Sequence, residues 1–160
     1  MENVEEIFKI MQTWVGEEEE PYTIEVDKTT MMKMPWVVGD PHPLWRDEKY
    51  ARQTCWGGLF ASPYLLDWLR HRPTYDSRFV PKDRAPLPGK PGNVVGGEEV
   101  EYFLPIRVGD KITLRYKITD VKRRKSGSLN KDIIIMSQQI TFTNQFGQVV
   151  MTHKSTSIKV

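Results

Sequence analysis

The sequence predicts an α+β fold in which a curved antiparallel sheet packs on a central helix. The clearest helical pattern begins at Ser62, four long alternating segments follow residue 98, and one short strand precedes them. A chain of 160 residues has the size of one domain, and neither side of its Pro- and Gly-rich middle could form a full core alone. We therefore expect residues 1–160 to form a single domain.

The N-terminal part predicts a helix, a strand and a second, shorter helix. Apolar residues recur at helical spacing in the first stretch and then alternate as they do in strands. Asp27 or Thr29 can cap the third segment, and Pro35 is expected to kink or stop it. These elements are expected at residues 3–15, at 22–26 and from 30 onward.

The middle of the sequence predicts a functional loop followed by the central helix. Gly, Pro, Trp and charged residues are dense over 40–62, and loops with such mixed chemistry often carry binding or catalysis. Ser62 can cap the helix, with Pro63 at its first position. Residues 73–93 are rich in Pro and Gly, which predicts a flap or an excursion over a partner surface. The apolar stripe of the helix comprises Ala61, Tyr64, Leu65, Trp68 and Leu69.

The last third of the sequence predicts four antiparallel strands. Apolar and polar residues alternate in each segment, and turn signals rich in Gly and Ser separate the segments. Pro105 suggests that the first of these strands bends or meets a sheet edge. The strands are expected at residues 99–104, 112–118, 134–142 and 149–160.

Composition and charge argue against several classes of protein. A net charge of +2 is too small to indicate nucleic acid as the main partner. The acidic N-terminus does not resemble a signal peptide, and no run of about 18 apolar residues predicts a membrane span, so we expect a cytoplasmic protein. With Cys55 as the single cysteine and no zinc-like spacing among three histidines, we expect neither a disulfide, nor a metal, nor a separate cofactor.

Five segments together carry a family resemblance: Asp40–Asp47, Tyr50–Ala51, Gly57–Pro63, Gly96–Glu98 and Pro105–Asp110. They resemble MaoC-like hydratases and dehydratases, and most closely the N-terminal, fatty-acid-synthase-type dehydratase branch of that family. The resemblance runs in order through nearly the whole chain. It implies a hot-dog fold, in which the sheet wraps a long helix. It also implies acyl thioester substrates, usually acyl-CoA, and dimers with the acyl tunnel at the shared surface.

Active members of the family carry a D-x-N-P-x-H-x-D motif, whose Asp and His activate a water for addition to a 2-enoyl thioester. In this sequence Asp40 matches the catalytic Asp, whereas His42 stands where the Asn is expected. Pro43 and Asp47 match the motif, but Trp45 occupies the position of the catalytic His. An indole donates a hydrogen bond but does not shuttle a proton, so this departure removes half of the acid–base pair.

A second departure concerns the donor that stabilises the developing enolate. In active members, as the sequences align, a Gly at the start of the hot-dog helix donates its N–H to the thioester carbonyl. Pro63 stands there and has no N–H. Loss of one such donor typically costs about 2.7–4 kcal/mol of transition-state stabilisation. Gly57 or Gly58 could donate from another angle.

The same loop supplies the candidates for substrate binding. Its aromatic side chains suit apolar packing or a bulky acyl group, and Trp45 could instead fill the acyl tunnel or contact a neighbouring subunit. A basic cluster near the third turn could bind CoA phosphates or form a solvated hairpin tip. The substrate-binding candidates are Trp45, Trp56, Gly57, Gly58 and Pro63, and the basic cluster comprises Lys122, Arg123, Arg124 and Lys125.

These departures predict a non-catalytic subunit of a heteromeric (R)-specific 2-enoyl-CoA hydratase or 3-hydroxyacyl-CoA dehydratase. A second hot-dog subunit would carry the intact site, and CoA would enter only as part of the substrate. Two alternatives stay open. In the first, a reshaped loop pairs Asp40 with His42 as a catalytic dyad, and the chain is a self-sufficient homodimeric enzyme. In the second, the chain is a non-enzymatic acyl-CoA-binding module.

Overall fold

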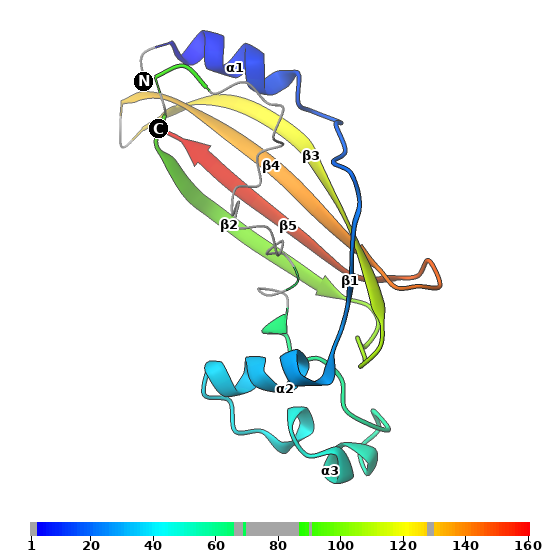
Figure 1. The fold of residues 1–160 in the computed structure, drawn as a ribbon. Coiled ribbons are helices and arrows are strands. Elements are labelled where there is room, and N and C mark those ends of the chain that lie inside the picture. The colour runs from blue at the N-terminus through cyan, green and yellow to red at the C-terminus, as the bar shows by residue number, and fades with distance from the viewer. Residues whose placement is uncertain (1–2, 66–68, 70–86, 90, 128–129) are drawn as a thin grey trace.

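The computed structural model describes residues 3–65, 69, 87–89, 91–127 and 130–160. Five antiparallel strands form one curved sheet in the order β1-β3-β4-β5-β2 (Figure 1). The α+β class and the antiparallel sheet predicted from the sequence are confirmed. The strands are β1 (Tyr22–Glu25), β2 (Asn93–Tyr102), β3 (Lys111–Ser126), β4 (Lys131–Thr143) and β5 (Val149–Lys159).

The strands divide their side chains between a core face and an outer face. On the core face Ile118, Ile134 and Phe142 are fully buried. Phe142 lies opposite Met151 on the neighbouring strand, so apolar side chains stack from strand to strand. A register shift between Ile118 and Asp120 changes which residues face the core along β3. The outer face of the same strands is mostly polar.

Helix α1 (Val4–Gln12) covers part of the core face, where Ile7 and Met11 are fully buried (Figure 1). The predicted amphipathic helix is therefore present, but it ends three residues before the expected residue 15. The N–H and the hydroxyl of Thr13 both donate to the Ile10 carbonyl and close the last turn there.

Three short helical elements lie together beyond one end of the sheet (Figure 1). Helix α2 (Lys28–Val37) begins two residues before the expected Thr30, because the Asp27 carboxylate accepts the Thr30 N–H at 2.9 Å. Pro35 lies inside α2 without stopping it. The expected continuous loop over 40–62 is wrong in part, since it contains two helical turns. These are the 3₁₀ turn η1 (Pro43–Trp45) and helix α3 (Glu48–Arg52).

The central helix is described only at Leu65 and Leu69, which are both helical and buried. The rest of its predicted length, and most of the predicted flap over 73–93, lie outside the described residues. The expected cap is wrong. Within the described part of the chain the Ser62 hydroxyl has no hydrogen-bond partner, and the Leu65 N–H bonds instead to the Ser62 carbonyl at 3.0 Å.

The long strands extend further than the sequence pattern indicates. β2 begins at Asn93 rather than 99, through a bulged Val95–Gly97 segment, and ends before Leu104. β3 runs to Ser126, so the basic cluster lies on a paired strand. Its four side chains are exposed next to the turn that follows Ser126, in agreement with the alternative of a solvated hairpin tip. Within the described part of the chain, no helix is long and apolar enough to cross a membrane.

Candidate functional site

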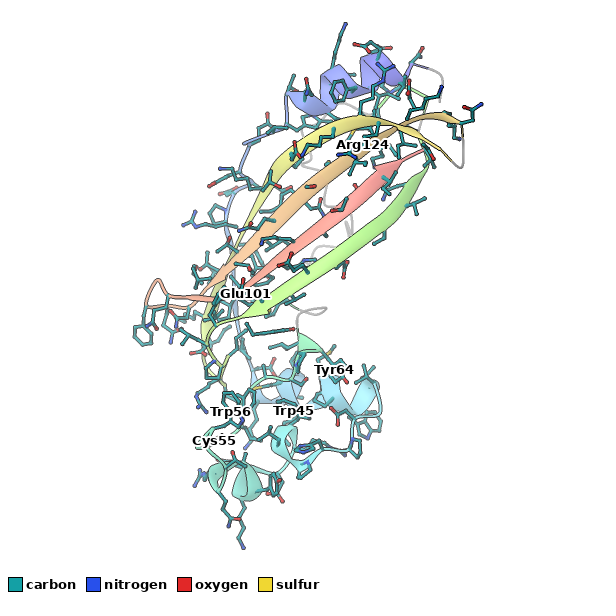
Figure 2. The ribbon with its side chains drawn as sticks, turned by 180° about the vertical axis from the view of Figure 1, so that it is seen from behind. Trp45, Cys55, Trp56, Tyr64, Glu101 and Arg124 are labelled. Carbon is teal, nitrogen blue, oxygen red and sulfur yellow. The ribbon has the colours of Figure 1, made fainter. Side chains whose placement is uncertain are left out.

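An apolar pocket of about 160 Å³ opens where the loop before the central helix meets the segment that follows β2. Figure 2 shows Trp45, Trp56 and Tyr64 close together at this end of the molecule. The Ala61 N–H donates to the Ile106 carbonyl at 2.8 Å and joins the two walls. The pocket is lined by Trp45, Trp56, Phe60, Ala61, Ser62, Pro63, Leu65, Tyr102, Phe103, Leu104, Pro105, Ile106 and Met151.

Both oxygens of the Asp40 carboxylate are held by donors from its own loop. Oδ1 accepts the backbone N–H of His42 at 2.9 Å, and Oδ2 accepts the indole Nε1–H of Trp45 at 2.9 Å. Trp45 is part-buried, so this second bond is shielded from solvent. A carboxylate held in this way braces the loop and positions the indole, and the indole cannot relay a proton for it.

The His42 side chain is exposed and has a structural role in its own loop. Its Nδ1 accepts the Leu44 N–H at 3.2 Å, which caps the 3₁₀ turn η1. The ring lies 6.3 Å from the Trp45 ring and 6.2 Å from the Tyr50 ring, measured between centroids. The structure thus brings Asp40 and His42 together through the His42 main chain, not through its imidazole.

Three aromatic rings form one wall of the pocket. The rings of Trp45 and Phe60 meet edge to face with centroids 5.0 Å apart, and Trp56 tilts against Phe60 at 4.5 Å. Gly57 and Gly58 adopt φ values of +66° and +157°, which turn the chain between these rings at little conformational cost. The two predicted glycines therefore shape the wall and are not among the residues that line the pocket.

Pro63 and Ser62 both line the pocket, where Pro63 is exposed and Ser62 is buried. The Pro63 carbonyl accepts a hydrogen bond from the Tyr102 hydroxyl at 3.3 Å, and its imide nitrogen offers no donor. Ser62 is only 3% exposed, and its hydroxyl has no hydrogen-bond partner among the described residues. Sequence reasoning assigned Ser62 to capping and missed it as a polar group of the pocket. Its sequence position between Ala61 and Pro63 carried no signal of this.

Arg107 is a second residue whose role the sequence analysis did not identify. Its guanidinium donates to the carbonyl of Trp56 at 2.6 Å and to that of Leu59 at 3.3 Å. Its own N–H donates to the Asp110 carboxylate at 2.7 Å. Arg107 therefore ties the aromatic wall to the start of β3. The sequence signal was its place in the Pro105–Asp110 segment, which by itself indicated only a turn.

The predicted CoA-phosphate cluster lies at the opposite end of the sheet, where Figure 2 labels Arg124. From Lys111 to Arg124, β3 spans about 40 Å at roughly 3.3 Å per residue, so the cluster is far from the pocket of its own chain. Lys122 is ion-paired with Asp120. Arg123 contacts both Glu5 and Asp132, and the Asp132 carboxylate, at 2.7 Å, raises the pKa of the guanidinium above its usual value.

No group of three or more His, Cys, Asp or Glu side chains among the described residues is placed to hold a metal ion. The described residues that line the pocket give it apolar walls. The Asp40 carboxylate is not among these lining residues, and it is already bonded twice within its own loop. This arrangement is suited to binding an apolar group. It does not present an acid–base pair formed by the described residues of this chain.

Three comparisons relate the chain to known proteins. The family model described as "FAS1-like, dehydratase domain region" matches residues 13–153. A search of curated proteins gives no significant match. Among solved structures, a MaoC-like dehydratase from Rhodospirillum rubrum is similar, with 23% identity, 91% of each chain covered and a TM-score of 0.68.

Two further similar structures are complexes from Mycobacterium tuberculosis. For the ChsH1-ChsH2 complex the identity is 17%, the coverage 98% of this chain and 96% of that chain, and the TM-score 0.75. For the C-terminally truncated HadBC complex, a (3R)-hydroxyacyl-ACP dehydratase, these values are 20%, 91%, 96% and 0.64. At such identities the similarity shows the fold, which is the hot-dog fold predicted from the sequence.

Proposed function

Because this chain belongs to the FAS1-like dehydratase domain family, we propose that it is the non-catalytic subunit of a heteromeric (R)-specific 2-enoyl-CoA hydratase or 3-hydroxyacyl-CoA dehydratase. In this role it completes the fold of the assembly and shapes the acyl pocket. A second hot-dog subunit supplies the Asp and His that activate water. CoA takes part as the carrier of the substrate, with no separate cofactor.

The observation that carries this proposal is the bond from the Trp45 indole to Asp40 Oδ2. Hydration of a 2-enoyl thioester needs one group that takes a proton from water and another that delivers a proton to the α-carbon. At the motif position of the catalytic His this chain has Trp45, whose indole N–H donates a hydrogen bond and never changes its protonation state. Asp40 is thus engaged in holding a ring, and among the described residues no proton carrier stands at the position of its motif partner.

The start of the central helix supports the same conclusion. An N–H at Pro63 is chemically impossible, and the carbonyl of this residue already accepts a bond from Tyr102. Without that donor, the negative charge that develops on a thioester oxygen at this position loses stabilisation. Both halves of the expected chemistry, proton transfer and oxyanion binding, are therefore weakened at one site.

Two surface features support a second subunit. The side chains around the pocket mouth leave much apolar area exposed: Trp56 is 43% exposed, Tyr102 50% and Phe103 49%. A contiguous apolar surface of this kind is typical of a site that a partner covers. β2 is also an edge of the sheet, and along its ten residues no other described strand pairs with its outer side. Two of the similar structures, ChsH1-ChsH2 and HadBC, are complexes of two named components.

The proposal is tested by purifying the chain alone and together with a candidate partner that carries an intact D-x-N-P-x-H motif. Hydration of short and bulky 2-enoyl-CoA substrates is followed for each preparation and for the partner alone. We expect turnover only when the partner is present, and a higher kcat/KM for the mixture than for the partner alone. Comparable turnover by the isolated chain would refute the proposal. In that case, loss of activity in both Asp40→Asn and His42→Ala would identify a self-sufficient enzyme.

A non-enzymatic acyl-CoA-binding module is the second candidate, favoured by the pocket itself, because the pocket has apolar walls without an acid–base pair. It predicts saturable binding of acyl-CoA to the chain and no change in the turnover of any hydratase partner. Titration calorimetry with a non-reactive acyl-CoA, alongside the activity assay, separates the two functions.

A further inference from the structure

The outer face of the sheet, opposite the core face, carries charges of opposite sign on its two sides. Its side chains lie in rows that cross β3, β4, β5 and β2 in this order (Figure 1). We infer that two copies of this chain associate through the outer face, about a twofold axis that runs along the strands between β4 and β5. The inference goes beyond the proposed function and does not depend on it.

One row crosses the outer face at the level of Arg115. Arg115 on β3 is opposite Thr141 on β4, which is opposite Thr152 on β5. Thr152 is in turn opposite Glu101 on β2, which Figure 2 labels. The residues before and after this row on β3, β4 and β5 are buried, so the row itself points away from the core.

The two ends of this row carry charges that lack partners within the chain. Arg115 and Glu101 are both exposed, and neither side chain forms an ion pair or a hydrogen bond in the described part of the chain. Three strand spacings of about 4.8 Å separate β3 from β2, so these charges lie roughly 14 Å apart and cannot pair with each other. The next row repeats the pattern, with Lys117 on β3 and Glu99 on β2.

A twofold axis along the strands exchanges the two sides of the face. It places β3 of one copy against β2 of the other and β4 against β5, and it keeps each row at its own level. Arg115 of each copy then faces Glu101 of the other copy. Stacked sheets lie about 10 Å apart, a gap that an Arg and a Glu side chain can span together. A second copy therefore matches the charges by symmetry alone, which an unrelated partner would not do.

The shape and the apolar content of the face agree with this arrangement. In the row of Arg115 the middle strands carry short Thr side chains and the outer strands carry long ones, as two convex surfaces that touch along their middle require. Another row is apolar: Ile135 on β4 is opposite Ile158 on β5, which is opposite Val94 on β2. Under the same axis Ile135 of one copy meets Ile158 of the other, and Val94, which is 51% exposed, is covered.

The size of the face sets the expected strength of the association. Four strands are roughly 19 Å wide, and β4 from Ile133 to Thr141 is about 27 Å long, which gives roughly 500 Å² per copy. A total of about 1,000 Å² is at the lower limit of specific interfaces. We therefore expect a reversible dimer rather than an obligate one. The outer edge of β2 stays free for the second hot-dog subunit.

The test measures self-association of the full-length chain by sedimentation velocity over a wide range of concentrations. We expect a reversible equilibrium between monomer and dimer. Arg115→Glu and Glu101→Arg each bring like charges together at two symmetric places, and each is expected to raise the Kd for self-association at least about tenfold. Lys49→Glu is the matched control, because it makes the same change of charge at an exposed site on α3, outside the face. This control is expected to leave the Kd unchanged.

An equimolar mixture of Arg115→Glu and Glu101→Arg isolates the symmetry. In the mixed dimer one contact joins the two reversed charges and the other joins the two native charges, so both contacts are attractive. We expect the mixture to associate with a Kd within about threefold of the wild-type value. Damage to the fold of either variant could not produce this recovery.

Three results would overturn the inference: a monomer at every concentration, charge-reversal variants that associate like the wild type, or a mixture that associates no more tightly than either variant alone. If one reversal does not fold by circular dichroism, Arg115→Gln and Glu101→Gln replace the pair. Each is then expected to reduce the salt dependence of the Kd, and an unchanged salt dependence would contradict the inference. The measurement needs neither acyl-CoA nor a catalytic partner, so failure of the proposed hydratase role would leave its outcome unaffected.

Discussion

The two ends of the sheet differ in which kinds of side chain they expose to solvent. At the pocket end, aromatic side chains such as Trp56 and Tyr102 are about half exposed, while the polar groups Asp40 and Ser62 are partly or fully buried. At the far end the charged side chains of β3 are exposed and form ion pairs, as Lys122 does with Asp120. The far end has the ordinary character of a protein surface in water, and the pocket end does not.

This difference shows which end of the molecule carries groups that are unfavourable for an isolated chain in water. Exposed ion pairs contribute little to stability and indicate solvation more than function. Exposed aromatic rings around a pocket, together with a buried unpaired hydroxyl, are unfavourable for an isolated chain and become favourable when a ligand or a partner covers them. We therefore expect the function to reside at the pocket end, and four sets of variants test this difference from the largest expected effect to the smallest.

The largest effect is expected from restoring the two missing chemical groups. The triple variant His42→Asn, Trp45→His and Pro63→Gly recreates the motif and the backbone donor. Because an acid–base group typically contributes about 10²–10⁴-fold and an oxyanion donor about 10²–10³-fold, we expect enoyl-CoA hydration by the variant chain at least a hundredfold above the wild-type chain. Trp45→Phe is the control, because it removes the indole without adding a proton carrier. Equal rates for all three proteins would show that these two groups do not limit hydration by this chain.

The next effect concerns the hydrogen bond from Trp45 to Asp40. Trp45→Phe leaves Asp40 Oδ2 without its part-buried donor, so we expect the free energy of unfolding to fall by about 1.5–3 kcal/mol in urea denaturation. Trp56→Phe is the matched control, since the Trp56 side chain packs its ring against Phe60. A loss no larger for Trp45→Phe than for this control would mean that the bond to Asp40 does not stabilise the loop.

A smaller effect is expected at Arg107, which holds the aromatic wall. Arg107→Met keeps the length of the side chain but loses the donors to the Trp56 and Leu59 carbonyls. We expect faster amide hydrogen exchange over residues 56–61 and a loss of about 1–2 kcal/mol in unfolding free energy. Arg107→Lys, which keeps one charged donor, is expected to recover part of the protection. Unchanged exchange in Arg107→Met would show that other contacts hold the wall.

The smallest effect is expected at the far end of the sheet. Arg124→Ala removes an exposed charge on β3, and we expect the free energy of unfolding to change by no more than about 0.5 kcal/mol. Acyl-CoA affinity of the isolated chain should also stay the same, because β3 separates this residue from the pocket by roughly 40 Å. A clear loss of CoA affinity would restore the phosphate-binding role predicted for the basic cluster.

Much of the fold could be predicted from the sequence because period-2 and period-3.6 patterns are local. The strands after residue 98 and the helix near the N-terminus follow directly from such patterns. What could not be predicted were elements whose apolar pattern is short or absent. Helix α3 has five residues and is capped by Asp47, whose carboxylate accepts the Tyr50 N–H at 3.0 Å. The early start of β2 depends on pairing with β5, which is a contact distant in sequence.

The sequence by itself determined which chemistry is missing: an indole cannot carry a proton and a proline has no N–H, whatever the fold. Only the tertiary structure decided what the remaining groups do instead. It showed that Asp40 holds Trp45, that Arg107 holds the wall of the pocket and that the Ser62 hydroxyl is left unpaired. The physical reason is that the identity of a side chain sets its chemical capacity, whereas its partners and its burial are set by segments that meet only when the chain folds.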